Sequence, residues 1–368
     1  MCQLATIKRR APLPRYRPDL ENIPTYSPGR PTAEVAADLG LDRIVELASN
    51  ECPSSPIPEI QAAIAAALST IHRYPLTGSE HLVAALSKHL DIGADTVWVG
   101  PGSTSILTSI ALATSGPGTS VVFGDPSFVV YRLAALLAGA EPIPVPLDTA
   151  LRLDPEAMAG AVRPDTAVIY YCNPNNPTST HSSKDDVQRL VDLVPDSVTI
   201  VIDEAYAEFV DADDFASAIP LTFDHDNVIV SRTFSKVYGL AGLRIGYAIG
   251  DSATIGALRR PQAPFATGAL AQIAAIEALK HQDAVASQIE LNTIGRAYLT
   301  NQLRNLEQET TDSQTNFVLW EPRTEAGPLA GELLAAGLRV RPMGPWIRVT
   351  VGTEEENALA ISMISGVL

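Results

Sequence analysis

The chain is poor in cysteine: its 368 residues include only Cys2, Cys52 and Cys172. So few and so scattered cysteines exclude a disulfide framework and the paired spacing of a structural zinc site. The six histidines show no ligand spacing either. We therefore expect no bound metal, and we expect the protein to work in the reducing cytoplasm.

Basic residues and long apolar runs are scarce as well. The sequence has 26 Lys and Arg against 42 Asp and Glu, a formal net charge of -16. Such a charge repels nucleic acid and anionic membranes, so neither partner is expected. No stretch approaches the roughly eighteen apolar residues of a membrane span. No apolar run follows the basic residues 8–10, so we expect no secretory signal.

Lysine is also rare, and one lysine has unusual neighbours. Lys236 lies in the segment 231–244, flanked by hydroxyl residues and glycines. Burial among small residues would lower its pKa toward the neutral, nucleophilic amine, which favours Schiff-base chemistry. The alternative is a lysine that extends from a loop to solvent. The other four lysines, beside charged or polar neighbours typical of solvated surfaces, are Lys8, Lys88, Lys184 and Lys280.

Three apolar runs end in polar residues. Residues 198–202 precede Asp203, residues 167–172 precede an asparagine- and proline-rich turn, and residues 96–99 precede a glycine-rich turn and a helix-like stretch. These runs predict buried parallel strands, whose carboxyl ends form the ligand-binding edge of a sheet. Asp203 could there be a metal ligand, a nucleotide-binding carboxylate or the partner of a protonated ring nitrogen.

The order of segments predicts an α/β fold. Strand-like and helix-like segments alternate from about residue 96 to 250, which indicates a mostly parallel sheet covered by helices on both faces. The chain is longer than one typical core requires. We expect a large domain of residues 45–282 and a smaller α+β domain formed by the two chain ends, residues 1–44 and 283–368.

Individual helices are also predicted. Prolines at residues 53–58 precede a helix over 60–68, and a long helix over 284–306 would link the two domains. Thr353 and Glu356 form a capping box that begins the last helix.

Four passages carry a family resemblance: residues 173–178, 203–206, 231–244 and 346–353. Looser likeness at 26–30, 47–51 and 73–75 extends it over nearly the whole chain. In this order and spacing the passages resemble the class I/II aminotransferases of fold type I, which depend on pyridoxal 5'-phosphate, and among them the histidinol-phosphate aminotransferase group. The resemblance implies both the fold expected above and this cofactor.

The resemblance implies three catalytic residues. Lys236 would hold the cofactor covalently and move protons during transfer, Asp203 would pair with the pyridinium nitrogen, and Tyr206 would donate to the 3-hydroxyl. Asn176 would be a second donor to that hydroxyl. Each residue also has a purely structural alternative: Asp203 could cap the next turn, Tyr206 could fill a core position, and Asn176 could be a turn residue.

Phosphate binding requires amides and hydroxyls at a helix start, and Gly102, Ser103 and Thr104 open a predicted helix. By itself this signal is weak. The resemblance adds Thr233, Ser235 and Arg244, and it implies that Tyr74 reaches the phosphate from the neighbouring subunit of a homodimer with shared active sites.

The resemblance also implies substrate contacts. Phe128 would stack on the cofactor ring, and Arg348 would bind the substrate α-carboxylate through its guanidinium fork. The residues expected near the rest of the substrate are Arg341, Tyr26 and Asn50.

The sequence departs from the family pattern at the substrate rim. Ser179 replaces a usual glycine, Thr104 a common acid and Phe128 a usual tyrosine, and residues 264–267 lack an asparagine. These departures indicate a member with altered specificity.

We expect an aminotransferase that moves an amino group between a donor, histidinol phosphate or an aromatic or related amino acid, and a 2-oxo acid such as 2-oxoglutarate. A decarboxylase of a phosphorylated amino acid, or another specialised enzyme of the same fold and cofactor, is the alternative. A non-catalytic cofactor-binding or nucleotide-binding module is disfavoured because no Gly-x4-Gly-Lys-Ser/Thr loop occurs.

Overall fold

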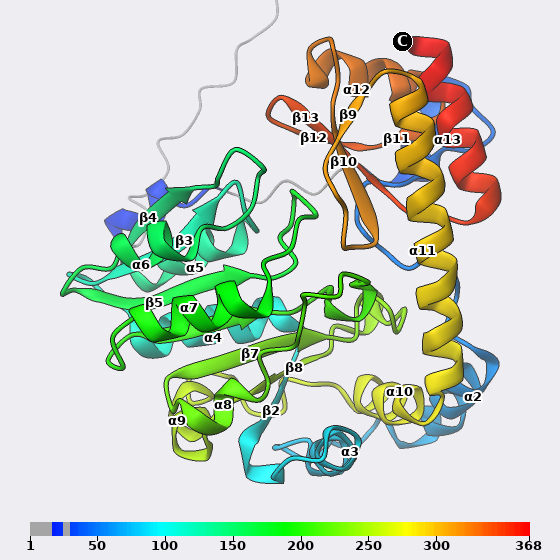
Figure 1. Ribbon diagram of the computed structural model, residues 1–368. Coiled ribbons are helices and arrows are strands. Elements are labelled where there is room, and N and C mark those ends of the chain that lie inside the picture. Colours follow the sequence, from blue (N-terminus) through cyan, green and yellow to red (C-terminus); the bar gives the residue numbers. More distant parts are fainter. Residues whose placement is uncertain (1–16, 25–29) are drawn as a thin grey trace, which may run out of the picture.

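The computed structural model describes residues 17–24 and 30–368, and its largest element is a β-sheet (Figure 1). Within these residues the sheet has seven strands in the order β2-β8-β7-β6-β5-β3-β4. All neighbouring strands pair in parallel except β8, which is antiparallel to both β2 and β7. The expected mostly parallel sheet is confirmed. Its strands are β2 (Val97–Gly100), β3 (Ser120–Asp125), β4 (Glu141–Pro146), β5 (Thr166–Cys172), β6 (Thr199–Asp203), β7 (Val228–Thr233) and β8 (Gly246–Ile249).

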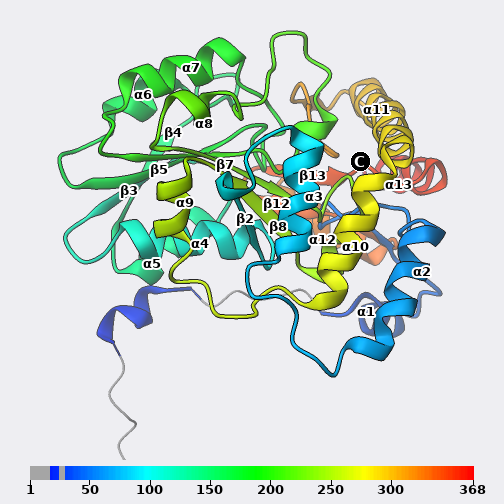
Figure 2. The same cartoon turned by 90° about the horizontal axis from the view of Figure 1, so that it is seen from below.

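Successive side chains of the central strands enter opposite hydrophobic cores, as the two-residue period of a strand requires. In β5, Val168 and Tyr170 pack in the core of α4 and α5, whereas Ile169 and Tyr171 pack in the core of α6 and α7. Figure 2 shows these helix pairs on opposite sides of the sheet. The continuous apolar sequence of β5 therefore follows from burial on both faces. The helices are α4 (Ser103–Thr114), α5 (Val130–Ala138), α6 (Pro155–Gly160) and α7 (Lys184–Leu193).

A third core covers the edge of the sheet. Val97 and Val99 of β2 and Tyr247 of β8 pack there against three helices. These are α2 (Pro58–Ala67), α3 (Glu80–Leu90) and α10 (Ala269–Lys280). The remaining short elements of this region are α8 (Leu221–Asp224), α9 (Ser252–Leu258), η2 (Leu68–Thr70), η3 (Ala94–Thr96), η4 (Ala207–Phe209) and η5 (Ala241–Leu243).

The C-terminal part of the chain forms a smaller antiparallel sheet in the order β12-β13-β10-β9. N-terminal residues pack beside this sheet: β1 pairs in parallel with β11 in a separate two-stranded sheet, and Val45 lies in the same core as Leu338 and Val349. The predicted domain boundaries, residues 44/45 and 282/283, stay a prediction. The elements are η1 (Pro18–Asn22), α1 (Thr32–Leu39), β1 (Val45–Glu46), β9 (Glu309–Thr310), β10 (Phe317–Glu321), α12 (Ala326–Ala335), β11 (Leu338–Arg339), β12 (Arg341–Met343), β13 (Trp346–Thr350) and α13 (Glu354–Val367).

The long helix α11 (Gln282–Asn305) joins the two sheets (Figure 1). Ile289 packs against the core of α2, α3 and α10, and Leu299 lies in the core of the small sheet. At the start of α13, Thr353 and Glu356 exchange the side-chain hydrogen bonds of the predicted capping box. No helix in the described ranges is long and apolar enough to cross a membrane. The predictions for Cys2, Lys8 and Tyr26 concern residues outside those ranges.

Candidate active site

A cavity of about 480 Å³ lies at the carboxyl ends of β5, β6 and β7, between the large sheet and β12 and β13. The strand register places Cys172, Asp203 and Ser231 side by side at this edge. The predicted residues that line the cavity are Asn50, Ser103, Thr104, Phe128, Asn176, Asp203, Tyr206, Thr233, Ser235, Lys236, Arg244, Arg341 and Arg348.

Lys236 lies in the loop that follows β7. Its Nζ donates a hydrogen bond to the main-chain oxygen of Asn50 at 2.9 Å and lies 5.5 Å from the centre of the Tyr206 ring. Burial and, to a smaller extent, the charge of Arg348 lower the pKa of Lys236 to about 8, while Glu51 opposes this decrease. Roughly a tenth of this amine is therefore neutral at pH 7, far more than for an ordinary lysine.

Asp203 ends β6, the central strand, and is only 1% exposed. Its Oδ2 accepts a hydrogen bond from the Tyr131 hydroxyl at 2.8 Å, whereas its buried Oδ1 has no partner among the described residues. Burial raises the pKa of the Asp203 carboxyl to about 6, and the bond from Tyr131 opposes this increase. A buried acceptor without a donor is costly, so Oδ1 is suited to a donor on a ligand.

Tyr131 was missed by the sequence predictions. It lies in the first turn of α5, three residues after Phe128, and its ring meets the Phe128 ring edge-on at 5.8 Å between centroids. The one signal available in the sequence was this three-residue spacing from a predicted cofactor contact.

Asn50 connects several groups around the lysine. Its Nδ2 donates to the Tyr206 hydroxyl at 3.1 Å, and its main-chain N–H donates to Oγ1 of Thr350 at 2.9 Å. Its carbonyl accepts from Lys236 and from Nδ2 of Asn316. Burial raises the pKa of Tyr206 to about 12, so its phenol stays protonated. Asn50, predicted to bind substrate, makes these hydrogen bonds to protein groups.

An anion-binding corner lies at the start of α4. Gly102 is the N-cap, without a side-chain cap, so the first amides of the helix have no carbonyl partner within it. Gly102 has a φ of +85°, and a Cβ there would lie 2.7 Å from Nη2 of Arg244. A Cβ at Gly246 would lie 2.7 Å from the amide nitrogen of Ser103. Gly102 therefore permits the close approach of the Arg244 guanidinium to the helix terminus, and Gly246 permits the close approach of β8 to the same terminus. The guanidinium and the helix amides together attract an anion.

Two hydroxyls complete this corner. Arg244 Nη1 donates to Oγ of Ser235 at 3.4 Å, and Oγ1 of Thr233 accepts from the amide of Ser235 at 3.1 Å. The structure therefore brings all the predicted phosphate residues of a single chain together, with Gly102 directly before the lining residue Ser103.

Two arginines come from the small sheet. The register places Arg348 of β13 directly opposite Arg341 of β12. Arg348 donates to Oδ1 of Asn176 at 2.5 Å and to the carbonyl of Ala48 at 2.7 Å, and lies 5.2 Å over the Phe317 ring. Like charges on facing strands destabilise a sheet. Their placement at one cavity therefore indicates anionic groups on a ligand.

Two predicted residues lie elsewhere. Tyr74 is 82% exposed, stacks on Phe265 at 4.7 Å between ring centroids and does not line the cavity. Tyr26 lies outside the described residues. Ser179, which replaces a usual glycine, has a φ of +62°, and its hydroxyl hydrogen-bonds with that of Thr311 at 2.8 Å.

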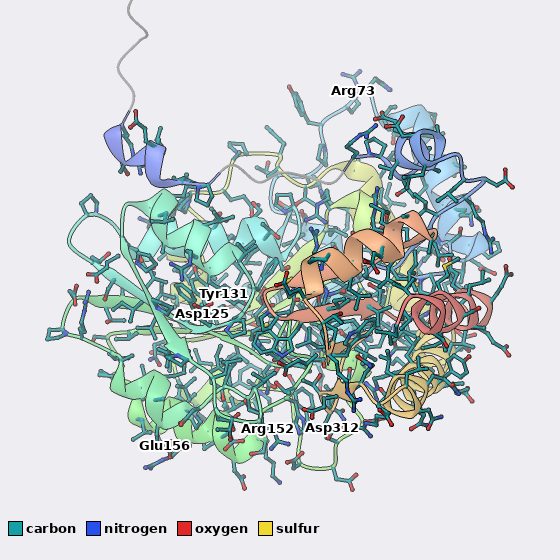
Figure 3. The ribbon with its side chains drawn as sticks, turned by 90° about the horizontal axis from the view of Figure 1, so that it is seen from above. Arg73, Asp125, Tyr131, Arg152, Glu156 and Asp312 are labelled. Carbon is teal, nitrogen blue, oxygen red and sulfur yellow. The ribbon has the colours of Figure 1, made fainter. Side chains whose placement is uncertain are left out.

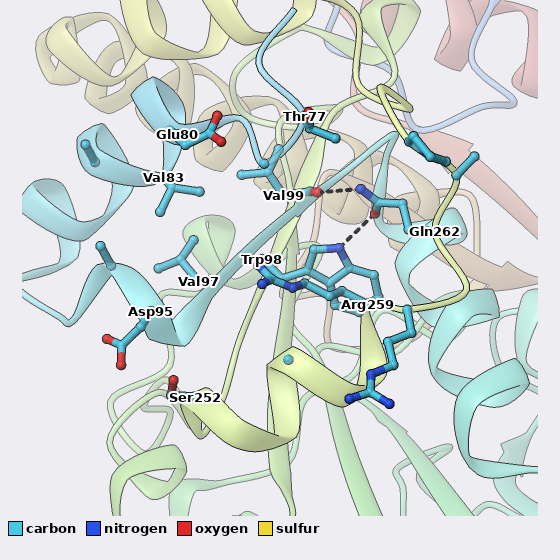
Figure 4. Close-up of a pocket in the computed structure, with 17 residues that line it drawn as sticks. Thr77, Glu80, Val83, Asp95, Val97, Trp98, Val99, Ser252, Arg259 and Gln262 are labelled. Carbon is cyan, nitrogen blue, oxygen red and sulfur yellow. Dashed lines mark hydrogen bonds between the residues drawn. The ribbon is translucent and has the colours of Figure 1, made fainter.

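A larger cavity of about 850 Å³ lies beside β2 (Figure 4). It contains none of the predicted site residues, and its central polar groups satisfy one another. Nε1 of Trp98 donates to Oε1 of Gln262, whose Nε2 donates to the carbonyl of Val99. Over residues 17–24 and 30–368 there is no cluster of three or more metal-ligating side chains.

A partly neutral lysine and a buried carboxylate next to an anion-binding helix terminus match what pyridoxal-phosphate enzymes require of a protein. Comparison with known proteins agrees. Residues 42–364 match the family described as Aminotransferase class I and II. The chain belongs to this family and is a pyridoxal-phosphate-dependent aminotransferase.

The relatives carry two different names. The chain is 40% identical over 347 residues to an aromatic amino acid aminotransferase of Mycobacteroides abscessus, covering 93% of this chain and 96% of the relative. It is also 40% identical over 359 residues to histidinol-phosphate aminotransferase 2 of Ralstonia nicotianae, covering 94% and 95%. A solved histidinol-phosphate aminotransferase of Sinorhizobium meliloti in complex with pyridoxal 5'-phosphate matches with a TM-score of 0.90 at 25% identity, covering 97% and 98%.

The residues present fit the cofactor. The free Oδ1 of Asp203 offers an acceptor to a ring N–H, and the corner at Gly102 and Arg244 offers N–H donors to a phosphate. The predicted family resemblance, cofactor and enzyme class are confirmed.

Proposed function

We propose that this aminotransferase transfers the amino group of histidinol phosphate or of an aromatic amino acid to a 2-oxo acid such as 2-oxoglutarate. The observation that carries the proposal is the presence of Lys236, Asp203, Tyr206 and Arg348 in one cavity. The two relatives at 40% identity are named for the two donors, so their names do not choose between them.

The cofactor would be held by residues from both sides of the cavity. Lys236 would bind its aldehyde carbon, Asp203 Oδ1 its ring nitrogen, and Tyr206 and Asn176 its 3-hydroxyl, with Phe128 stacked on the ring. When bound, the cofactor supplies an electron sink that lowers the cost of removing the substrate Cα proton. The phosphate would lie among Gly102, Ser103, Thr104, Thr233, Ser235 and Arg244, joined by Tyr74 from the partner subunit.

Lys236 would act as the base. Its lowered pKa, about 8, leaves part of the amine free to accept the Cα proton on Nζ at neutral pH. Tyr206, with a pKa raised to about 12, keeps its proton and stays a donor. The lowered pKa of Lys236 and the raised pKa of Tyr206 therefore give the two residues different roles, the lysine as base and the tyrosine as hydrogen-bond donor.

Substrate binding would use the two facing arginines. Arg348 would bind the α-carboxylate, which requires its guanidinium to exchange or share the bond to Asn176. Arg341, which makes no ion pair with any described residue, would lie near the distal group together with Tyr26. Pro342 and Met343 also line this side of the cavity. An aromatic ring would contact these two apolar side chains, and a phosphate would bind to Arg341.

The two donors are separable by spectral titration of the half-reaction. The holoenzyme is mixed with histidinol phosphate, histidinol, phenylalanine and aspartate, and the loss of the cofactor's absorbance band is followed. In the Arg341→Gln variant, the KM for a phosphorylated donor rises roughly ten- to a hundredfold because a charged hydrogen bond is lost. Phenylalanine changes little.

Arg323→Gln is the matched control, since Arg323 is exposed and, among the described residues, its ion pair is with Glu307. If no amino donor converts the band in the wild-type enzyme, the proposed function is wrong. Equal effects of Arg341→Gln on both donors would remove Arg341 from the distal subsite.

Neither the family nor the relatives named above favour the decarboxylase alternative. Release of carbon dioxide without a 2-oxo acid would select it. We also propose a cytoplasmic homodimer with shared active sites, and, for histidinol phosphate as donor, a part in histidine biosynthesis. The exposed Tyr74–Phe265 stack and the free thiols of Cys52 and Cys172 support the dimer and the reducing compartment, respectively.

A further inference from the structure

Tyr131 contacts Asp203 from behind the cavity. The residue is fully buried, is absent from the cavity lining and lies inside the larger domain (Figure 3). Its hydroxyl donates to one carboxylate oxygen of Asp203, and the other oxygen is the one without a partner among the described residues.

We propose that Tyr131 is a positioning residue for cofactor binding, which fixes Oδ2 of Asp203 so that Oδ1 meets the ring nitrogen with its negative charge retained. The inference rests on the proposed role of Asp203.

Aromatic contacts hold the Tyr131 ring on two sides. It stacks on Tyr170 with 4.8 Å between centroids and 10° between planes, and it meets Phe128 at 88°. A ring packed in this way cannot turn its hydroxyl from Asp203 without disturbing its neighbours. The same side chain therefore supports the proposed ring-stacking residue and the proposed ring-nitrogen partner.

A phenol is the suitable donor at this position. Burial raises the pKa of Tyr131 well above its ordinary value, so the hydroxyl stays protonated and always donates. Because it carries no charge, it leaves the negative charge of Asp203 for the ligand to balance. An arginine there would neutralise the carboxylate before the cofactor arrived.

Charged neighbours of Asp203 affect this balance. Glu204 next to it favours the protonated acid, and Lys236 favours the ionised form. Cys172 on β5 is neutral because burial raises its pKa to about 12. Burial itself favours protonation most strongly, so the bond from Tyr131 is the main interaction that opposes it. Without that bond, a proton shared with the ring nitrogen moves toward Asp203.

The test compares Tyr131→Phe with Tyr170→Phe. Tyr170 is equally buried and belongs to the same stack, but its hydroxyl donates to the carbonyl of Leu107. The apoenzymes are titrated with pyridoxal phosphate. Tyr131→Phe weakens cofactor binding roughly ten- to a hundredfold, the range for a lost hydrogen bond to a charged group, whereas Tyr170→Phe changes it less than about threefold.

A second readout separates positioning from general damage. With ¹⁵N-labelled cofactor bound, the ring-nitrogen chemical shift moves toward the unprotonated value in Tyr131→Phe and stays at the wild-type value in Tyr170→Phe. The kcat falls in Tyr131→Phe while the KM for the amino donor is nearly kept. Identical affinities and chemical shifts for the two variants overturn the proposal.

Asp203→Asn is the third arm of the experiment. If this variant binds the cofactor as tightly as the wild type, the proposed role of Asp203 itself fails. If only Tyr131→Phe is without effect, the role of Asp203 stands and that of Tyr131 is wrong.

Discussion

Asp203 and Lys236 share one cavity, and burial shifts both pKa values against the charged form. The Asp203 pKa rises to about 6 and the Lys236 pKa falls to about 8. Without a ligand, both residues therefore make the folded apoenzyme less stable near neutral pH than ordinary side chains would. Such a loss of stability is expected where a site is arranged to bind a charged cofactor.

The Asp203→Asn apoenzyme should be more stable than the wild type at pH 7. The folded pKa of Asp203 lies above its unfolded value, so its contribution is lost as pH rises from about 4 to about 6, by about 3 kcal/mol. Asparagine does not titrate, and the weaker bond to Tyr131 leaves a net gain of about 1–2 kcal/mol.

Urea unfolding of both apoenzymes at pH 4 and pH 7 measures this difference. The advantage of the variant should shrink toward pH 4, where wild-type Asp203 is almost fully protonated in the folded state and about half protonated in the unfolded state. If the unfolding free energy of the wild type rose relative to that of the variant as pH rises, the raised pKa of Asp203 would be wrong.

Lys236 should react as a low-pKa amine. Labelling of the apoenzyme with trinitrobenzenesulfonate, mapped by peptide, should show a midpoint near pH 8 at Lys236. In Arg348→Gln the midpoint should rise, because the arginine charge lowers the pKa. The exposed Lys280 provides the reference peptide in the same sample. If the labelling midpoint of Lys236 is the same in Arg348→Gln as in the wild type, the charges of Lys236 and Arg348 do not interact.

The junction of β2 and α4 depends on glycine. Gly102→Ala places a methyl group at a φ of +85° and 2.7 Å from Arg244 Nη2. We expect a loss of about 1–3 kcal/mol in unfolding free energy and roughly tenfold weaker cofactor binding, because the guanidinium must move. Thermal unfolding and cofactor titration measure the two effects.

Gly160→Ala is the control for that substitution. Gly160 ends α6, an added Cβ would meet nothing within 4 Å, and the change should be neutral or stabilising. A Gly102→Ala protein that matches this control would show that the corner adapts without cost.

The strands of the large sheet and the capping box of α13 were predictable because their signals are local. Residues 167–172 and 198–202 are continuous apolar runs, and they form β5 and β6 nearly as predicted. The antiparallel direction of β8 was not predictable, since Gly246–Ile249 is too short to show a period and direction depends on its neighbours.

The composition of the site was predictable and its connections were not. Lys236, Asp203 and Arg348 lie in recognisable motifs, and all three line the cavity. The bonds between Asn50 and Thr350 join residues 300 positions apart, and that from Tyr131 to Asp203 joins residues 72 apart. Such contacts are products of tertiary packing, which a motif in one segment does not encode.

The net charge of the chain and the charge of the residues that line the site have opposite signs. The chain carries a formal charge of -16, yet Lys236, Arg244, Arg341 and Arg348 line one cavity. A cationic cavity in an anionic protein attracts small anions while the remaining surface repels large polyanions. This distribution suits phosphate and carboxylate ligands.

The proposed homodimer can be tested through Tyr74. Tyr74 is 82% exposed and does not line the cavity of its own chain, so its proposed contact with the phosphate must cross a subunit interface. Tyr74→Phe keeps the stack on Phe265 but loses the hydroxyl, and should need roughly tenfold more cofactor. Lys236→Ala should be inactive at any cofactor concentration.

Mixing these two variants at limiting cofactor, after dissociation and reassociation, should restore activity. In a mixed dimer, one site combines both substitutions and the other has an intact Lys236 and an intact Tyr74 from the partner subunit. Random pairing makes half of the dimers mixed, so about a quarter of wild-type activity should return. If both residues of a site came from one chain, each mixed dimer would keep one site of each defective kind and activity would not rise above the average of the two variants.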